Sequence, residues 1–188
     1  MWKVDIISMS FGLMKKKRIK AIHREIDKCV KAGILIFAAA NNDGGNSGRA
    51  YPAKHGDGVF CVHSATGEGA RATYNPTPEP HEDNFSFVGD GLFSCWPSSP
   101  ESNHMRYMSG TSFATPVAAA VAAFLIGYIR KNMPEHEEWC DPPTSFQGIR
   151  KLFLMMSEKR DNYDWVNLLE FFSNNEDRIM SEIESKLE

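Results

Sequence analysis

A serine flanked by small residues is the strongest chemical signal in this sequence. It is Ser112, in the run Ser109-Gly110-Thr111-Ser112-Phe113-Ala114-Thr115-Pro116. A serine hydroxyl attacks only when a base takes its proton and hydrogen-bond donors stabilise the oxyanion that forms. Small neighbours admit a substrate backbone, and a helix amino end offers free N–H groups and positive dipole charge. On local grounds the run predicts either a catalytic serine or a plain helix cap.

An asparagine that follows an apolar strand is the second signal. Residues 34–38 are continuously apolar and lead through Ala39-Ala40-Asn41-Asn42 into a polar, glycine-rich loop. The Asn42 amide can donate a hydrogen bond to an oxyanion there. Taken alone, however, asparagine in such a loop more often reflects its tolerance of left-handed backbone. Asn42 therefore becomes informative only together with Ser112.

Two kinds of serine hydrolase compete for this pattern. The run around Ser112 is one residue away from the nucleophile elbow of α/β-hydrolases, which needs a strong strand before the serine and then an acid and a histidine after it. Residues 103–109 make a poor strand, and the first histidine after Ser112 is His136, whose direct neighbour Glu135 is the only acid between them. The sequence therefore disfavours an α/β-hydrolase.

The order of the remaining segments resembles another family, the subtilisin-like serine proteases, in which the acid and the histidine both precede the serine. The Gly110–Pro116 run with its alanine-rich helix is similar to the family's serine segment. Residues 34–42 resemble the strand that ends in the oxyanion asparagine, and Tyr51-Pro52-Ala53 resembles the turn that follows it. The resemblance covers about residues 4–130 and is greatest to fungal members without a secretion signal. It implies Ser112 as nucleophile, with Asn42 and the Ser112 backbone N–H as oxyanion donors.

The resemblance also implies a peptide-binding surface. Ile7-Ser8-Met9-Ser10-Phe11-Gly12 resembles the substrate-binding strand, in which Ser10, Phe11 and Gly12 pair with a peptide backbone. Ala39, Ala40 and Asn41 then form the opposite wall of the primary specificity pocket. Asn41 departs from the family, which usually has glycine there. Side-chain preference is therefore not readable from these residues.

The acid and the base of a catalytic triad are not recognisable. Neither the Asp-Ser/Thr-Gly motif nor the His-Gly-Thr motif occurs in the chain. We do not expect a base among the histidines, which are His23, His55, His63, His81, His104 and His136. Loss of one triad member removes most of the rate enhancement. We therefore expect a fragment that is inactive by itself and that needs the missing N-terminal part of the same catalytic domain.

Composition narrows the class of protein. The 188 residues are 42% hydrophobic and 24% charged with net charge −3, which suits a globular protein and argues against a dedicated nucleic-acid binder. The four widely spaced cysteines indicate free thiols rather than metal ligands, and no leader is visible. The 13-residue apolar stretch 117–129 is too short to span a bilayer. We expect no cofactor, no metal and no membrane or nucleic-acid partner, and we lean towards the cytoplasm.

Hydrophobic periodicity predicts the fold. Strands are expected at residues 4–10, 34–38, 59–62, 85–88 and 92–94, and helices at 15–32, 116–131, from 144, and 168–187. Apolar strands joined by a helix indicate a parallel α/β sheet covered on both faces. The resemblance makes this a three-layer α/β/α sandwich. We expect residues 1–132 to be the C-terminal portion of a peptidase domain and residues 133–188 a helical extension.

Two functions remain open. The first is a serine endopeptidase that hydrolyses a peptide or protein substrate. The alternative is a non-catalytic peptide-binding pseudoprotease, which would keep the substrate strand and lose the chemistry. The presence of both Ser112 and Asn42 favours the enzyme, since a chain that had lost the activity would not need to keep either.

Overall fold

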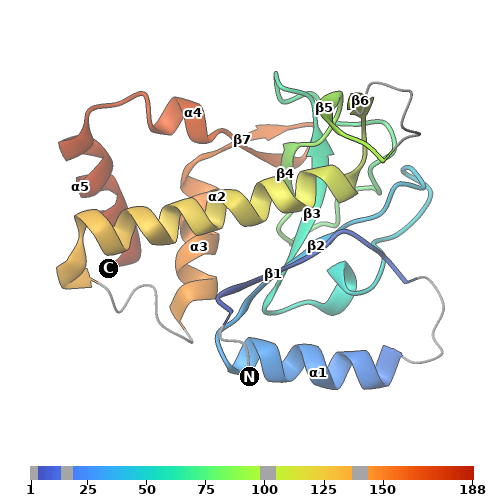
Figure 1. The fold of residues 1–188 in the computed structure, drawn as a ribbon, viewed down its shortest axis with the longest axis horizontal. Helices are drawn as coiled ribbons and strands as arrows, with labels where there is room; N and C mark the ends of the chain where they lie inside the picture. Colours follow the sequence, from blue (N-terminus) through green and yellow to red (C-terminus); the bar gives the residue numbers. More distant parts are fainter. Residues whose placement is uncertain (1–3, 14–18, 98–104, 137–143) are drawn as a thin grey trace.

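One six-stranded sheet organises the chain. The computed structural model describes residues 4–13, 19–97, 105–136 and 144–188 (Figure 1). The strand order is β1-β2-β3-β4-β8-β7, with parallel pairing from β1 to β8 and an antiparallel edge strand β7. The strands are β1 (Ile6–Met9), β2 (Leu35–Ala39), β3 (Val59–Ala65), β4 (Phe85–Val88), β8 (Tyr163–Val166) and β7 (Ser157–Arg160). The largely parallel sheet confirms the predicted fold class.

The central strands are apolar because both of their faces are covered. All residues of β2 and β3 are buried. Alternate side chains enter different cores: Leu35 and Phe37 belong to one hydrophobic cluster, whereas Ile36 and Ala38 belong to the other. This division follows from the two-residue period of a strand.

Helices form the outer two layers. Helix α1 (Ile19–Lys31) packs on one face through Ile26, beside the 3₁₀ helix η1 (Ala53–His55). The opposite face is covered by α2 (Thr111–Asn132), α3 (Thr144–Met155), α4 (Leu168–Phe171) and α5 (Glu176–Leu187). Figure 1 shows the sheet between α1 and the long helix α2. The arrangement is the predicted three-layer sandwich.

Helix α2 is a core helix. By length and composition it is the one helix of the described residues that could cross a membrane. Its residues Ala114, Ala118, Ala122 and Leu125 are fully buried in the cluster that also contains the sheet residues Phe37 and Phe87. Its apolar character is therefore explained by burial against the sheet. The prediction of residues 116–131 placed this helix correctly, although it begins five residues earlier, at Thr111.

Three strands were not predicted. Residues 103–109 were expected to be a poor strand, yet β6 (Met105–Met108) pairs with β5 (Leu92–Cys95) as a separate antiparallel hairpin. Residues 133–188 were expected to be helical, yet β7 and β8 form a hairpin within the main sheet. Its two turn residues, Asp161 and Asn162, have positive φ angles of 50° and 68°, as a two-residue hairpin turn requires.

The C-terminal segment shares the core of the rest of the chain. Leu152, Phe153 and Ile183 lie in the same cluster as Phe37 and Leu125. Strand β8 pairs directly with β4. The tail predicted as one helix is divided into α4 and α5, and the side chain of Asn175 caps α5 by accepting a hydrogen bond from the Arg178 N–H. The domain division at residue 132 stays a prediction, but the sheet and the core both extend across it.

Candidate active site

The predicted catalytic residues lie at one edge of the sheet. Because β1 to β4 are parallel, the loops that follow them leave from the same edge. These loops begin with Ser10 after β1, Ala40 after β2 and Gly89 after β4. The first turn of α2 meets them there, since the Gly110 N–H donates to the Gly89 carbonyl at 2.9 Å. The topology therefore brings Ser112 and Asn42 together.

Asn42 is held by the first residue of α2. Its Oδ1 accepts hydrogen bonds from the Thr111 backbone N–H at 2.8 Å and from the Thr111 hydroxyl at 3.1 Å. The Thr111 hydroxyl also lies 3.3 Å from the Asn41 carbonyl oxygen. Thr111 is fully buried, so this anchor is shielded from water. With the Oδ1 atom occupied, the orientation of the amide is fixed and its Nδ2 remains available as a donor.

Gly110 separates the two predicted catalytic groups. A Cβ atom placed on Gly110 would lie 3.4 Å from Asn42 Nδ2 and 3.5 Å from Ser112 Oγ, so both atoms border the same small space. Its backbone angles, φ 157° and ψ 156°, belong to a region that is essentially restricted to glycine. Gly110 thus supplies both the backbone bend before α2 and the room above the serine.

Ser112 is the second residue of a 22-residue helix. The Gly110 carbonyl accepts from the N–H groups of Phe113 and Ala114, whereas the Ser112 N–H has no partner among the described residues. Free N–H groups at a helix start carry the positive end of the dipole. Ser112 therefore has a hydroxyl, a free backbone donor and the Asn42 amide around one space.

Gly89 allows this close packing. A Cβ atom there would lie 2.7 Å from both Ala114 Cβ and Ser64 Oγ. Only glycine lets the loop after β4 approach the first turn of α2 so closely. Tyr74 supports the same loop, because its hydroxyl contacts Ser64 Oγ at 2.8 Å and the Gly89 carbonyl at 3.4 Å. The sequence reasoning named neither Gly89 nor Tyr74.

Asn41 occupies a strained position. Its φ is 151°, a value that residues with a side chain rarely adopt. Its Oδ1 accepts from the Asn42 N–H at 2.7 Å, and its Nδ2 donates to Ser47 Oγ at 2.9 Å and to the Gly48 carbonyl at 3.2 Å. These bonds offset the strain and direct the amide into its own loop. Glycine, which the resemblance gives for this position, would adopt this backbone without strain.

The predicted peptide-binding residues differ in exposure. Ser10, Phe11 and Gly12 follow β1 and are exposed, with Phe11 at 55%. Ala39 and Ala40, which were predicted to form the facing wall, are buried at 5% and 0%. Just beyond, Leu13 pairs with Tyr51 through two backbone hydrogen bonds of 2.7 and 3.2 Å. The exposed segment Ser10–Gly12, which extends β1, therefore ends at the Leu13–Tyr51 bridge.

The described histidines lie away from Ser112. His23 and His55 gather around Asp27 on the α1 side of the sheet. His63 is fully buried and contacts the Phe85 carbonyl at 3.2 Å, and His81 lies in the loop between β3 and β4. His136 follows α2 at its other end, about 30 Å along the helix from Ser112. His104 lies outside the described residues.

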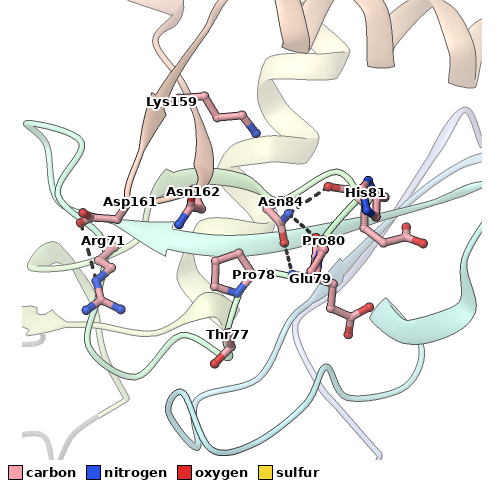
Figure 2. Close-up of a pocket in the computed structure, with 11 residues that line it drawn as sticks. Arg71, Thr77, Pro78, Glu79, Pro80, His81, Asn84, Lys159, Asp161 and Asn162 are labelled. Atoms are coloured by element: carbon pink, nitrogen blue, oxygen red, sulfur yellow. Dashed lines mark hydrogen bonds and ion pairs between the residues drawn. The ribbon is translucent and has the colours of Figure 1, made fainter.

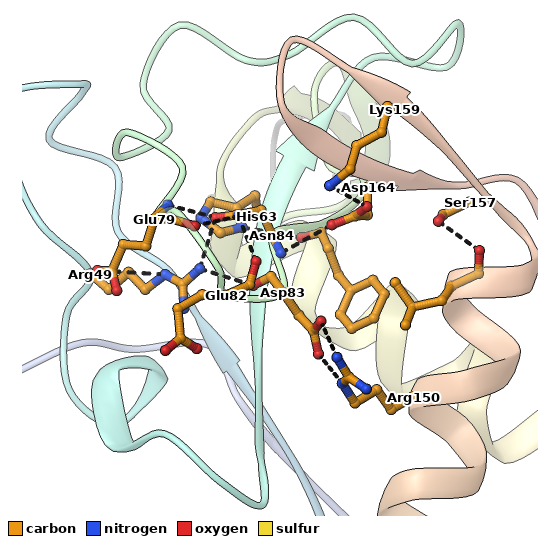
Figure 3. A network of polar contacts seen from close by, with 12 residues as sticks. Arg49, His63, Glu79, Glu82, Asp83, Asn84, Arg150, Ser157, Lys159 and Asp164 are labelled. Atoms are coloured by element: carbon orange, nitrogen blue, oxygen red, sulfur yellow. Dashed lines mark hydrogen bonds and ion pairs between the residues drawn. The ribbon is translucent and has the colours of Figure 1, made fainter.

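A buried polar network joins β3, β4 and β8, and sequence reasoning missed it (Figure 3). Arg49 donates to Asn84 Oδ1 at 2.8 Å, and the Asn84 N–H donates to an Asp164 carboxylate oxygen at 3.2 Å. Burial, reinforced by the Arg49 charge, lowers the pKa of His63 to about 3. The network explains why these polar residues are buried, because they satisfy one another's hydrogen bonds. Its role is to hold the strands together.

A surface pocket of about 660 Å³ lies beside this network (Figure 2). Its wall includes Arg71, which pairs with Asp161 at 3.6 Å, together with Asn84 and Lys159. None of the predicted site residues lines it. The pocket therefore does not belong to the candidate active site.

Two groups of the described residues have the donor atoms for a metal ion. They are His23, Asp27 and His55, and Glu135, His136 and Glu184. The described cysteines are not among them: Cys29, Cys61 and Cys95 form no disulfide, and burial raises the pKa of the Cys61 thiol to about 12. Cys140 lies outside the described residues. Neither group includes Ser112 or Asn42.

Known proteins with similar sequences are proteases. Subtilisin-like protease het-Q2 of Podospora anserina is 24% identical over 181 residues, which are 90% of this chain and 49% of that protein. Minor extracellular protease Epr of Bacillus subtilis (strain 168) is 32% identical over 65% of this chain and 18% of its own length. Subtilisin DY of Bacillus licheniformis is 30% identical over 65% and 43%. The chain thus spans about half or less of these curated relatives.

Solved structures share the fold. The protease domain of PatA has a TM-score of 0.69 at 19% identity, over 96% of this chain and 60% of that one. The prenylagaramide maturation protease PagA has a TM-score of 0.67 at 20% identity, over 88% and 60%. The model of the Subtilase family matches residues 2–168. This chain belongs to the subtilase family of serine peptidases.

Proposed function

We propose that this chain supplies the nucleophile and the oxyanion donors of a serine endopeptidase. In this proposal Ser112 Oγ attacks the carbonyl carbon of a peptide bond, and the hydroxyl proton passes to a base. The oxyanion accepts hydrogen bonds from Asn42 Nδ2 and the Ser112 N–H. The single observation that carries the proposal is the anchoring of Asn42 Oδ1 by Thr111, which leaves Nδ2 beside Ser112.

The proposed substrate is a peptide or protein in extended conformation. Ser10, Phe11 and Gly12 are exposed after the edge strand β1, so their backbone is open to pairing with a peptide. Ala39, Ala40 and Asn41 form the facing wall in this proposal. One structural neighbour, the PatG macrocyclase, was solved in complex with peptide, with a TM-score of 0.61 at 19% identity over 81% of this chain and 42% of that chain. That likeness supports a peptide as the ligand, but it does not indicate which side chains the peptide should carry.

The base and the acid are proposed to come from a part of the catalytic domain outside these 188 residues. Neither triad motif occurs in the sequence, and the described histidines lie elsewhere. Two surfaces suit the docking of such a part. Strand β1 is a sheet edge with free backbone groups, and α2 exposes Ala120, Ala123 and Phe124. On this proposal the isolated chain is inactive.

The test uses the longest reading frame that contains this chain. Its product is purified and assayed for peptide hydrolysis and for labelling by a fluorophosphonate probe, which reacts with activated serines. We expect an Asp-Ser/Thr-Gly and a His-Gly-Thr motif upstream, with hydrolysis that Ser112→Ala abolishes. His81→Gln is the matched control. A folded product that binds peptides without hydrolysing them would establish the pseudoprotease instead.

A further inference from the structure

Two histidines share one carboxylate on the α1 side of the sheet. His23 and Asp27 are one helical turn apart on α1, and His55 ends the 3₁₀ helix η1 that packs beside it. His55 Nε2 lies 3.1 Å from one carboxylate oxygen of Asp27, and His23 Nε2 lies 3.8 Å from the other. One donor atom from each residue falls within 4.8 Å of the other two.

Hydrogen bonding accounts for only part of this arrangement. The contact between His55 and Asp27 has hydrogen-bond geometry, whereas that of His23 has only ion-pair distance. The two imidazole rings lie 4.2 Å apart between centroids, close enough for their charges to repel if both were protonated. The position of the His23 imidazole is therefore not explained by a hydrogen bond to Asp27.

Tyr51 prepares His55 to act as a ligand. Its hydroxyl lies 3.1 Å from His55 Nδ1, the ring nitrogen that faces away from Asp27. A histidine that binds a metal through Nε2 carries its proton on Nδ1 and donates it to a neighbouring oxygen, which fixes the ring. The buried Tyr51 hydroxyl can accept that bond. The His55 side chain is itself only 5% exposed, so its position is well defined.

We propose that His23, Asp27 and His55 form a binding site for a divalent transition metal ion such as zinc. Two imidazole nitrogens and one carboxylate oxygen are a ligand set that zinc accepts. Ligand atoms around a tetrahedral zinc lie about 3.3 Å apart, given bonds of about 2.0–2.1 Å. The half-exposed His23 side chain can rotate to close the remaining distance. Because the His23 and Asp27 side chains are 49% and 42% exposed, water could supply a fourth ligand.

The second group of possible ligands is a weaker candidate for such an ion. Glu135, His136 and Glu184 offer a single imidazole and two carboxylates. Carboxylate-rich sets suit harder cations, whereas imidazole favours zinc, copper and nickel. The two groups lie in different parts of the fold, so variants distinguish them.

The site would tie α1 to the turn that holds the exposed strand extension. Tyr51 pairs with Leu13, which directly follows the proposed peptide-binding residues Ser10–Gly12. A metal that holds His55 on Asp27 therefore steadies Tyr51 as well. We expect saturating zinc to raise the melting temperature of the chain and to slow proteolysis near Leu13.

The experiment measures zinc binding by isothermal titration calorimetry on the full chain, with Co²⁺ absorption as a probe of coordination. We expect one saturable site. His23→Gln and Asp27→Asn should each weaken binding at least about tenfold, the lower bound for losing even a supporting residue of a metal site. His81→Gln is the matched control and should bind like the unmodified chain. Circular dichroism verifies that each variant is folded, and the exposed position of His23 makes its variant the safest.

Three outcomes would overturn the proposal. The first is the absence of saturable zinc binding by the folded chain. The second is unchanged affinity in both His23→Gln and Asp27→Asn. The third is binding that persists in His23→Gln and disappears in His136→Gln, which would assign the ion to the other group. Ser112 and Asn42 take no part in these measurements, so their result is independent of the proposed protease activity.

Discussion

The surroundings of Ser112 and those of Asp27 differ in what they contain. At the carboxyl edge of the sheet, Ser112 has an anchored amide and a free N–H but no described histidine. On the α1 side of the sheet, two histidines gather around Asp27. A complete triad would place a histidine and an acid beside the serine. The difference supports the proposal that Ser112 and its oxyanion donors form one structural unit and that the base comes from outside this chain.

The largest expected effect comes from the nucleophile. In the complete enzyme, Ser112→Ala should lower kcat by about 10⁶, as loss of the serine does in subtilisin. The exposed control His81→Gln should leave kcat within about twofold, because surface substitutions away from the site have small effects. Hydrolysis of a fluorogenic peptide measures both. Comparable activity in Ser112→Ala would remove Ser112 from the mechanism.

The next effect comes from Asn42. Its replacement by alanine removes an oxyanion donor, and kcat should fall by about 10²–10³, the loss found for such a donor in subtilisin. KM should change little, because the donor acts mainly in the transition state. The same variant also loses the Thr111 anchor, so Asn42→Asp, which retains an acceptor, serves as a comparison. A fall in kcat/KM confined to KM would contradict the role.

Gly110 tests whether the backbone at Ser112 is special. Gly110→Ala should destabilise the fold by about 1–3 kcal/mol, since alanine cannot adopt φ 157° without strain. The matched control is Gly127→Ala in the same helix, where an added Cβ meets nothing within 4 Å. That change should stabilise the fold by about 0.5–1 kcal/mol. Thermal unfolding of both variants measures the two changes in stability, which should be opposite in sign. Equal changes would argue against backbone strain at Gly110.

His63 predicts a pH dependence of stability. Its pKa is about 3 in the folded chain and 6.5 ordinarily, so below pH 6.5 the unfolded chain binds a proton that the folded chain refuses. The contribution of neutral His63 to the free energy of unfolding is complete above pH 6.5. It is lost at about 1.4 kcal/mol per pH unit as the pH falls towards 3. His63→Phe should show a smaller slope of unfolding free energy between pH 6 and pH 4 (about the middle of that window). Identical slopes would contradict the burial argument.

The smallest expected effect comes from Asn41. Asn41→Gly removes the strain at φ 151° and also the three hydrogen bonds of its side chain. Because the two terms oppose each other, stability should change by less than about 1 kcal/mol. Chemical denaturation measures the change. A loss of several times that amount would mean that the loop depends on the side chain.

The sequence predicted the parts of the fold that rest on local patterns. Apolar runs identified β2 and β3, and the three- and four-residue spacing of Ile22 and Ile26 identified α1. The hairpin of β7 and β8 was missed because its strand Tyr163–Val166 includes Asp164, whose burial depends on the distant Asn84. Such long-range compensation has no local signature.

The candidate site was predictable in its residues but not in its geometry. Motif order selected Ser112 and Asn42, and the parallel sheet explains why they meet. The anchoring of Asn42 by Thr111 and the close approach of Gly89 to Ala114 arise from tertiary packing, so neither was foreseen. In the His23–Asp27–His55 group, Asp27 and His55 are 28 positions apart in the sequence. The short-spacing motifs used to recognise metal sites do not cover such a separation.

Fluorophosphonate labelling of the 188-residue chain by itself is the sharpest test of whether Ser112 needs a base from outside the chain. We expect the folded chain not to be labelled above the level of Ser112→Ala, because no described histidine lies beside its serine. The complete domain, carrying the upstream acid and histidine, should be labelled strongly and only at Ser112. Strong, Ser112-dependent labelling of the 188-residue chain alone would show that the chain activates Ser112 without an external base.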